Sequence, residues 1–163
     1  MDTAFLGDLY RRYSGSVFRR ACALVRDTDT GKDVMQEVFL RACEARAEFT
    51  AAASPLSWLY RITTNTCLNR LRDTRRRRDI LESARATDEP VASPTTDMML
   101  TVRALLGRVP EEVQEIAVYY FVDQMSQEEI SVMLSIPRRT IGFRIEQFRT
   151  IALAAAREKE LAS

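Results

Sequence analysis

The chain has 163 residues, of which 46% are apolar, and only five glycines and five prolines, a composition that favours one or two packed helical domains. It contains no histidine, and its three cysteines (Cys22, Cys43 and Cys67) form no CxxC pair, which effectively excludes zinc sites and histidine-based general-base catalysis. No apolar run is long enough to span a bilayer, and no basic-then-apolar signal opens the chain. We therefore expect a soluble, cytoplasmic protein without membrane insertion.

The net charge of +1 conceals a segregation of the two signs along the chain. Residues 56–78 hold seven arginines against one aspartate, whereas residues 111–131 hold six acidic residues and no basic one. Nearly all the basic charge is arginine, whose planar fork suits phosphates and base edges. The codon usage of a GC-rich genome would explain much of this preference for arginine over lysine. Composition alone therefore leaves nucleic-acid binding open.

The N-terminal residues 2–25 have the apolar spacing of a helix, and Ser14-Gly15 predicts a break into two helices. A polar turn over residues 26–31 precedes the most regular helix of this half, residues 32–46. All three cysteines fall on the apolar sides of predicted helices. We expect them to be reduced core residues, with a redox switch as the alternative.

The helix over residues 32–46 has one apolar and one polar side. Leu40 projects from the middle of the polar side, which also holds Asp33, Gln36, Glu37, Arg41 and Glu44. A single exposed leucine is ordinary, but one ringed by charges of both signs also suits a protein partner. The pattern alone does not decide between the two.

After a loop of small residues at 48–54, Pro55 opens a long helix that reaches about residue 78. One side of it carries an aromatic residue, two amides and two guanidiniums: Trp58, Arg61, Asn65, Asn69 and Arg72. Such a row can stack bases and bond their edges, and the arginine cluster at 75–78 can contact phosphates. The alternative is a polar helix face with a half-buried tryptophan.

Residues 81–97 lose periodicity and contain Pro90 and Pro94, so we expect a linker there between domains 1–80 and 98–163. A helix is predicted over residues 98–109, and another begins at Pro110 with an inward side of Val113, Ala117, Tyr120 and Phe121. The sequence thus predicts an all-α fold of two small helical domains joined by a flexible linker.

The stretch from residue 126 to 149 predicts a helix-turn-helix in the C-terminal domain. Ser126 has the chemistry of a helix cap with acidic first-turn partners, Ser135-Ile136 interrupts the pattern, and Pro137 opens a second helix. That helix has an apolar stripe of Ile141, Ile145, Phe148 and Ala152, with arginines on its other faces. In a helix-turn-helix the second helix enters the major groove; the alternative is a pair of core helices with solvated arginines.

Three segments in this order resemble bacterial RNA polymerase sigma factors of the extracytoplasmic-function (ECF) group. They are residues 33–42 (DVMQEVFLRA), 57–65 (SWLYRITTN) and 134–144 (LSIPRRTIGFR), the last preceded by MSQEEI at 125–130. The resemblance covers nearly the whole chain. It implies a non-enzymatic specificity subunit without a cofactor or metal that binds core RNA polymerase and promoter DNA, and for which an anti-sigma factor can be a further partner.

The resemblance also implies three interaction surfaces. The polymerase-docking residues are Asp33, Gln36, Glu37, Leu40 and Arg41. The residues for recognition and melting of the minus-10 element are Trp58, Arg61, Asn65, Asn69, Arg72, Arg75 and Arg76, and the loop 49–54 matches the segment that holds a flipped base. The residues for the minus-35 element are Arg138, Arg139, Thr140, Phe143, Arg144 and Gln147.

Two departures from the family pattern fall in the helix-turn-helix. Ser135 stands where the family usually has glycine, so we expect a slightly strained turn, because glycine adopts left-handed backbone angles more readily. Gly142-Phe143 stands where the family often has a basic residue and then serine. A glycine inside a helix suggests a constraint on the groove side, and the minus-35 sequence should differ from the common one.

Two rival functions remain open at this stage. One is a stand-alone helix-turn-helix regulator that binds duplex DNA as a dimer, which would leave the Trp58 side without a role. The other is a helical adaptor that never contacts DNA. An enzyme is the least expected class, because the sequence offers no recognisable nucleophile–base pair or metal-ligand cluster.

Overall fold

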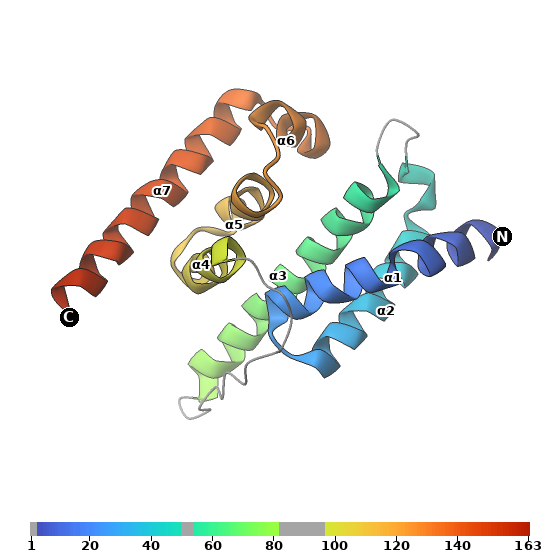
Figure 1. Cartoon of the computed structure of the whole chain (residues 1–163), viewed down its shortest axis with the longest axis horizontal. Coiled ribbons are helices and arrows are strands. Elements are labelled where there is room, and N and C mark those ends of the chain that lie inside the picture. Colours follow the sequence, from blue (N-terminus) through green and yellow to red (C-terminus); the bar gives the residue numbers. More distant parts are fainter. Residues whose placement is uncertain (1–2, 50–53, 82–96) are drawn as a thin grey trace. The chain divides into compact units, whose positions relative to one another are not determined.

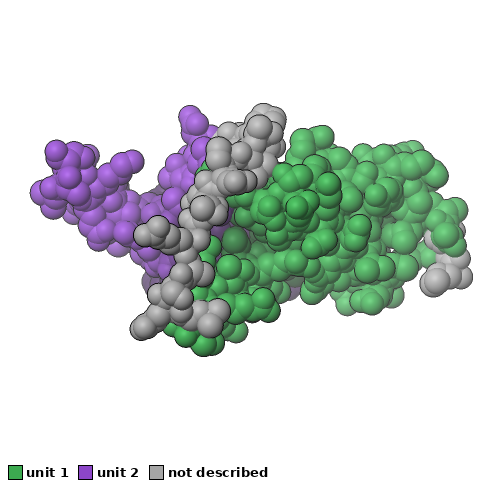
Figure 2. Space-filling model, turned by 90° about the horizontal axis from the view of Figure 1, so that it is seen from below, with its two compact units in different colours: residues 1–94 green, residues 95–163 purple. Residues whose placement is uncertain are grey.

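The computed structural model describes residues 3–49, 54–81 and 97–163, which form helices and short connections without a β-strand (Figure 1). The chain divides into two compact units, residues 1–94 and 95–163, coloured green and purple in Figure 2. The all-α class with two helical units is confirmed. The predicted linker lies almost entirely in residues 82–96, outside the described residues.

The N-terminal unit is built from three long helices and one short one: α1 (Thr3–Val25), α2 (Thr28–Glu44), the 3-10 helix η1 (Arg46–Glu48) and α3 (Pro55–Leu81). α1 packs against both α2 and α3, and α2 packs against α3. The centre is apolar and fully buried, with Val17 and Leu24 from α1, Val34 and Val38 from α2, and Leu59 from α3. This three-helix packing fixes which sides of α2 and α3 face solvent.

The predicted break at Ser14-Gly15 is wrong, because α1 runs unbroken through it. Leu9 on one side of the glycine and Val17 and Leu24 on the other are all buried, so both halves are held against the same neighbours. An exposed glycine costs a helix only about 1 kcal/mol relative to alanine. Tertiary packing of the apolar side outweighs that cost.

α2 begins at Thr28, four residues earlier than predicted. The Asp27 carboxylate caps it by accepting a hydrogen bond from the Thr30 backbone N–H at 2.8 Å, and the bonds from Thr30 lower the pKa of Asp27. Gly31, expected in the turn, is buried inside the helix, where an added Cβ would overlap the Cys22 sulfur of α1. Gly31 therefore permits the close approach of α1 and α2.

The three cysteines are free thiols. Cys22 and Cys67 are buried core residues as predicted, and burial raises the pKa of the Cys67 thiol to about 12. Cys43 is only half-buried, so the expectation of a core position does not fully hold for it. Its helix turns it toward the edge of the apolar side rather than the centre.

The C-terminal unit contains α4 (Asp97–Leu105), the 3-10 turn η2 (Leu106–Arg108), α5 (Glu111–Ala117), the π-helical turn η3 (Val118–Val122), α6 (Gln127–Leu134) and α7 (Arg138–Leu161). Its core contains Ile116, Tyr119, Ile130, Ile141 and Ile145. Tyr120 and Phe121, predicted to point inward, are only half-buried beside this core. The π-helical turn changes the angle between successive residues, so α-helical spacing does not extend past Ala117.

Candidate nucleic-acid and partner interfaces

The polar side of α2, which we call the docking face, consists of Asp33, Gln36, Glu37, Leu40 and Arg41. Val34, Val38 and Ala42 are buried on the other side of the helix, and this burial turns the docking face outward. Leu40 is 67% exposed, and Asp33, Gln36 and Arg41 are exposed around it. Leu40 therefore has the exposed position that the sequence predicts.

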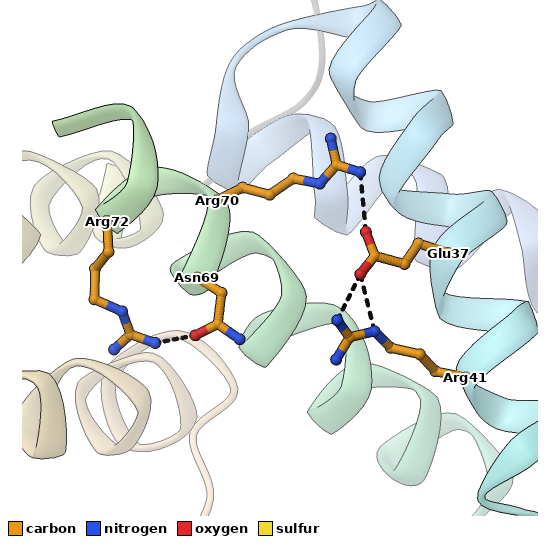
Figure 3. Close-up of polar contacts among 5 residues, drawn as sticks. All are labelled: Glu37, Arg41, Asn69, Arg70 and Arg72. Atoms are coloured by element: carbon orange, nitrogen blue, oxygen red, sulfur yellow. Dashed lines mark hydrogen bonds and ion pairs between the residues drawn. The ribbon is translucent and has the colours of Figure 1, made fainter. Parts of the chain in front are cut away.

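Glu37 differs from its neighbours on the docking face because it is half-buried and bonded to two arginines (Figure 3). Its Oε1 accepts from Arg41 Nε of the same helix at 2.9 Å, and its Oε2 accepts from Arg70 Nη2 of α3 at 2.9 Å. Partial burial alone raises the pKa of the Glu37 carboxyl, but the bonds from Arg70 and Arg41 outweigh it, so the pKa is lowered. Glu37 thus links the docking face to α3.

An open polar pocket of about 420 Å³ lies between α2 and the C-terminal half of α3. Its lining consists of Thr30, Glu37, Arg41, Thr66, Asn69, Arg70, Asp73, Thr74 and Arg77. The Thr66 hydroxyl is buried and has no hydrogen-bond partner among the described residues. Sequence reasoning missed this pocket and the Glu37–Arg70 pair, because 33 residues separate the two partners and no local spacing relates them.

One side of α3, which we call the α3 face, holds Trp58, Arg61, Asn65, Asn69, Arg72, Arg75 and Arg76. Asn69 and Arg76 are exposed, and the other five are half-buried. The Trp58 ring packs against Phe49, with 5.1 Å between ring centroids, and Phe49 packs against Phe5 at 6.0 Å. Trp58 is half-buried, which agrees with the structural alternative. Of the predicted flipped-base loop, residues 50–53 lie outside the described residues.

Two amides on the α3 face differ in their surroundings. Asn65 is half-buried, and it makes no side-chain hydrogen bond with another described residue. Asn69 is exposed, and its Oδ1 accepts a hydrogen bond from Arg72 (Figure 3). Because a guanidinium can only donate, this bond fixes the amide so that the Nδ2 donors of Asn69 remain available.

The α6–turn–α7 segment forms the predicted helix-turn-helix. Ser126 and Glu129 make a reciprocal capping box: Ser126 Oγ accepts from the Glu129 N–H at 3.1 Å, and Glu129 Oε2 accepts from the Ser126 N–H at 2.7 Å. Ser135 has φ 54° and ψ 40°, so the expected left-handed turn is present. The Ser131 hydroxyl supports it by donating to the Ile136 carbonyl at 2.6 Å.

The outward side of the N-terminal half of α7, which we call the recognition face, holds Arg138, Arg139, Thr140, Phe143, Arg144 and Gln147. Arg138, Arg139 and Phe143 are exposed and the other three are half-buried. None of the six side chains forms a hydrogen bond or ion pair with another described residue. Arg149 is different, since it pairs with Glu146 and lies 5.8 Å from the ring centroids of Tyr120 and Phe121.

Gly142 has a structural explanation that differs from the expected groove-side constraint. A Cβ added at Gly142 would lie 3.3 Å from Oε1 of Gln127 in α6. The tight space is therefore on the side of the partner helix α6.

Residues 9–77 match the family model described as Sigma-70 region 2. The RNA polymerase sigma-H factor of Pseudomonas aeruginosa is 26% identical over 156 residues, covering 86% of this chain and 80% of that protein. The ECF sigma factor SigW of Bacillus subtilis is 23% identical, covering 91% and 87%, and SigM of Mycobacterium tuberculosis is 28% identical, covering 91% and 75%.

A solved structure has the same fold. It is the sigma factor RpoE of Bartonella quintana in complex with the anti-sigma factor NepR, with a TM-score of 0.59 and 15% identity, and the match covers 91% of this chain and 94% of that one. The helical architecture is thus shared across both units of the chain.

The three-helix N-terminal unit and the capped helix-turn-helix both lie within the stretches that these relatives match. Together these matches support the assignment of the chain to the extracytoplasmic-function group of the sigma-70 family, a group of RNA polymerase sigma factors that direct transcription initiation. A stand-alone regulator is not favoured, because the matches to whole sigma factors extend across both units. No helix within the described ranges is long and apolar enough to cross a membrane.

Proposed function

We propose that this sigma factor binds core RNA polymerase through the docking face and recognises a promoter at two elements. The α3 face contacts the minus-10 element and assists its melting, and the recognition face contacts the minus-35 element. The observation that carries this proposal is the recognition face, where six side chains suited to bases and phosphates have no partner among the described residues. The protein itself contributes no covalent chemistry, and it acts in the cytoplasm with the polymerase.

The docking face supports the polymerase role by its composition. A leucine that is 67% exposed and surrounded by charges of both signs matches the layout of a protein interface, with an apolar centre and a polar rim. Since the related RpoE structure contains the anti-sigma factor NepR, we also propose an anti-sigma factor as a partner that competes with polymerase or DNA.

The α3 face supports the melting role because it offers a stacking surface next to hydrogen-bonding groups. Unstacking a base costs a few kcal/mol, and stacking it on an aromatic ring returns roughly 1–3 kcal/mol. Trp58 is half-buried and packs against Phe49, and we propose that its ring takes an unstacked base. Asn65 lies on the same side of the helix as Trp58. Because its side chain makes no hydrogen bond with a described residue, it is suited to bond a base edge.

Permanganate footprinting of promoter complexes tests the melting role. Trp58→Ala should bind core polymerase normally and open a matched promoter poorly, and a promoter mismatched in advance across the minus-10 element should rescue it. Asn65→Ala should open both templates but lose discrimination at the upstream end of the minus-10 element. Trp58→Phe, which keeps an aromatic ring, is the matched control. If wild type and Trp58→Ala open the matched promoter equally, Trp58 has no role in melting.

A further inference from the structure

Phe143 is the aromatic residue of the recognition face. It is 64% exposed, and no ring or cation contact to a described residue engages it. Its neighbours in sequence, Ile141 and Ile145, are buried at 0% and 1% exposure, so the helix is firmly seated on the core. The outward position of Phe143 therefore follows from the way that α7 packs on the core through Ile141 and Ile145, and not from loose packing.

Phe143 lies in a stripe with two polar residues. Arg139 is four residues before it and Gln147 four residues after it, so the three side chains follow one another along the same side of α7. Arg139 is exposed and Gln147 is half-buried, and neither forms a hydrogen bond or ion pair with a described residue. The stripe is a cation, an aromatic ring and an amide in a row.

The chemistry of the major groove determines what such a stripe can read. Arginine bonds the O6 and N7 acceptors of guanine, glutamine bonds N6 and N7 of adenine, and an apolar side chain contacts the 5-methyl group of thymine. That methyl is the apolar group on the major-groove edges of the four unmodified bases. Single exposed apolar residues are common, but this one occupies the N-terminal half of the helix that enters the groove.

We propose that Phe143 contacts the 5-methyl group of a thymine in the minus-35 element, and so sets a preference for thymine at one position of it. The position lies between those that Arg139 and Gln147 contact. This inference rests on the proposed function, because it needs α7 in the major groove of the minus-35 element.

Selection of promoters tests this inference with the full-length protein and core polymerase. A promoter library with a randomised minus-35 region is transcribed by wild type, Phe143→Ala and Phe143→Leu, and the transcribed templates are sequenced. Wild type should enrich thymine at one position, Phe143→Leu should enrich it less, and Phe143→Ala should not enrich it there. Leu153→Ala is the matched control, since Leu153 is 61% exposed on the same helix but lies beyond the recognition face.

Replacing the enriched thymine by deoxyuracil then removes the methyl group alone. With wild type this should lower transcription by about fourfold, the factor expected from uncovering one methyl group. With Phe143→Ala the two templates should be transcribed equally. An equal response of wild type to thymine and deoxyuracil would overturn the inference.

Failures of the inference and of the proposed function are distinguishable. If wild type and Phe143→Ala enrich the same minus-35 sequence, Phe143 does not read thymine while α7 still reads the element. If Phe143→Ala binds polymerase more weakly and the templates that it does transcribe keep the wild-type base preference, the ring contacts protein and the inference also fails. If no minus-35 sequence is enriched by either protein, the proposed function of the recognition face fails as well.

Discussion

Leu40 is a large apolar side chain that the fold does not use, since it is 67% exposed at the centre of the docking face. Leu40→Arg should therefore change the free energy of unfolding by less than about 0.5 kcal/mol yet abolish co-purification with core polymerase. Ile80→Arg is the matched control: Ile80 is 79% exposed but lies at the end of α3, outside the docking face. A large fall in melting temperature for Leu40→Arg would place Leu40 in the core.

Ser135 forms the turn between α6 and α7 with a left-handed backbone, φ 54°. A non-glycine residue is sterically strained in this conformation, and a β-branched residue is strained more. Ser135→Gly should raise the melting temperature or leave it unchanged, because glycine relieves the strain but loses more chain entropy on folding. Ser135→Val should destabilise the protein by at least about 1 kcal/mol. Urea melts of both variants measure this, and a valine variant as stable as wild type would contradict the strain.

The contact between α1 and α2 depends on Gly31. Gly31→Ala should destabilise the N-terminal unit by about 1–3 kcal/mol, the usual range for overpacking a core, because the added methyl overlaps the Cys22 sulfur. In Gly31→Ala/Cys22→Ala the overlap is removed, so part of the loss should be recovered. Gly15→Ala is the control, with an added Cβ that meets only the Arg19 guanidinium; it should stabilise α1 by up to about 1 kcal/mol. Strictly additive effects of the two substitutions at Gly31 and Cys22 would rule out this contact.

The bridge between α2 and α3 through Glu37 and Arg70 makes stability depend on pH. The pKa of Glu37 is lowered from its ordinary value of 4.5, so its carboxylate stabilises the folded state above that pH and the contribution is lost as the pH falls through the folded pKa. Glu37→Gln should be less stable than wild type at pH 7, by under about 1 kcal/mol because the pair is partly exposed. The difference should shrink as the pH falls below 4.5 and through the lowered folded-state pKa of Glu37.

Unfolding free energies of wild type and Glu37→Gln at pH 7 and pH 3 measure this contribution. Glu44→Gln, an exposed residue of α2 without an ion pair to α3, is the control for loss of a carboxylate alone. A stability difference between wild type and Glu37→Gln that stays constant with pH would mean that the ion pair with Arg70 contributes nothing.

Most helices were predictable because apolar spacing and caps are local properties of the sequence. Ser126 with Glu129 marks the start of α6, and Ser135 in place of glycine indicates a strained turn. The predicted break at Ser14-Gly15 was wrong because burial of Leu9 and Val17 outweighs a local preference. The Gly31–Cys22 contact and the Glu37–Arg70 pair depend on how helices meet, and no local pattern encodes that.

At the scale of the whole molecule, two helical units carry separate candidate surfaces for a partner and for DNA. The docking face and the α3 face belong to residues 1–94, and the recognition face belongs to residues 95–163. The order of these surfaces along the chain was predictable from the resemblance to ECF sigma factors. The assignment of a polymerase role and two promoter elements to particular residues stays a prediction.

Run-off transcription with purified core polymerase on a library of genomic fragments tests the central claim most directly. The full-length protein should produce discrete transcripts that core polymerase alone does not make, and their start sites should share two sequence elements upstream. Leu40→Arg should eliminate these transcripts. Transcription no different from that of core polymerase alone, or start sites without two shared elements, would contradict the account.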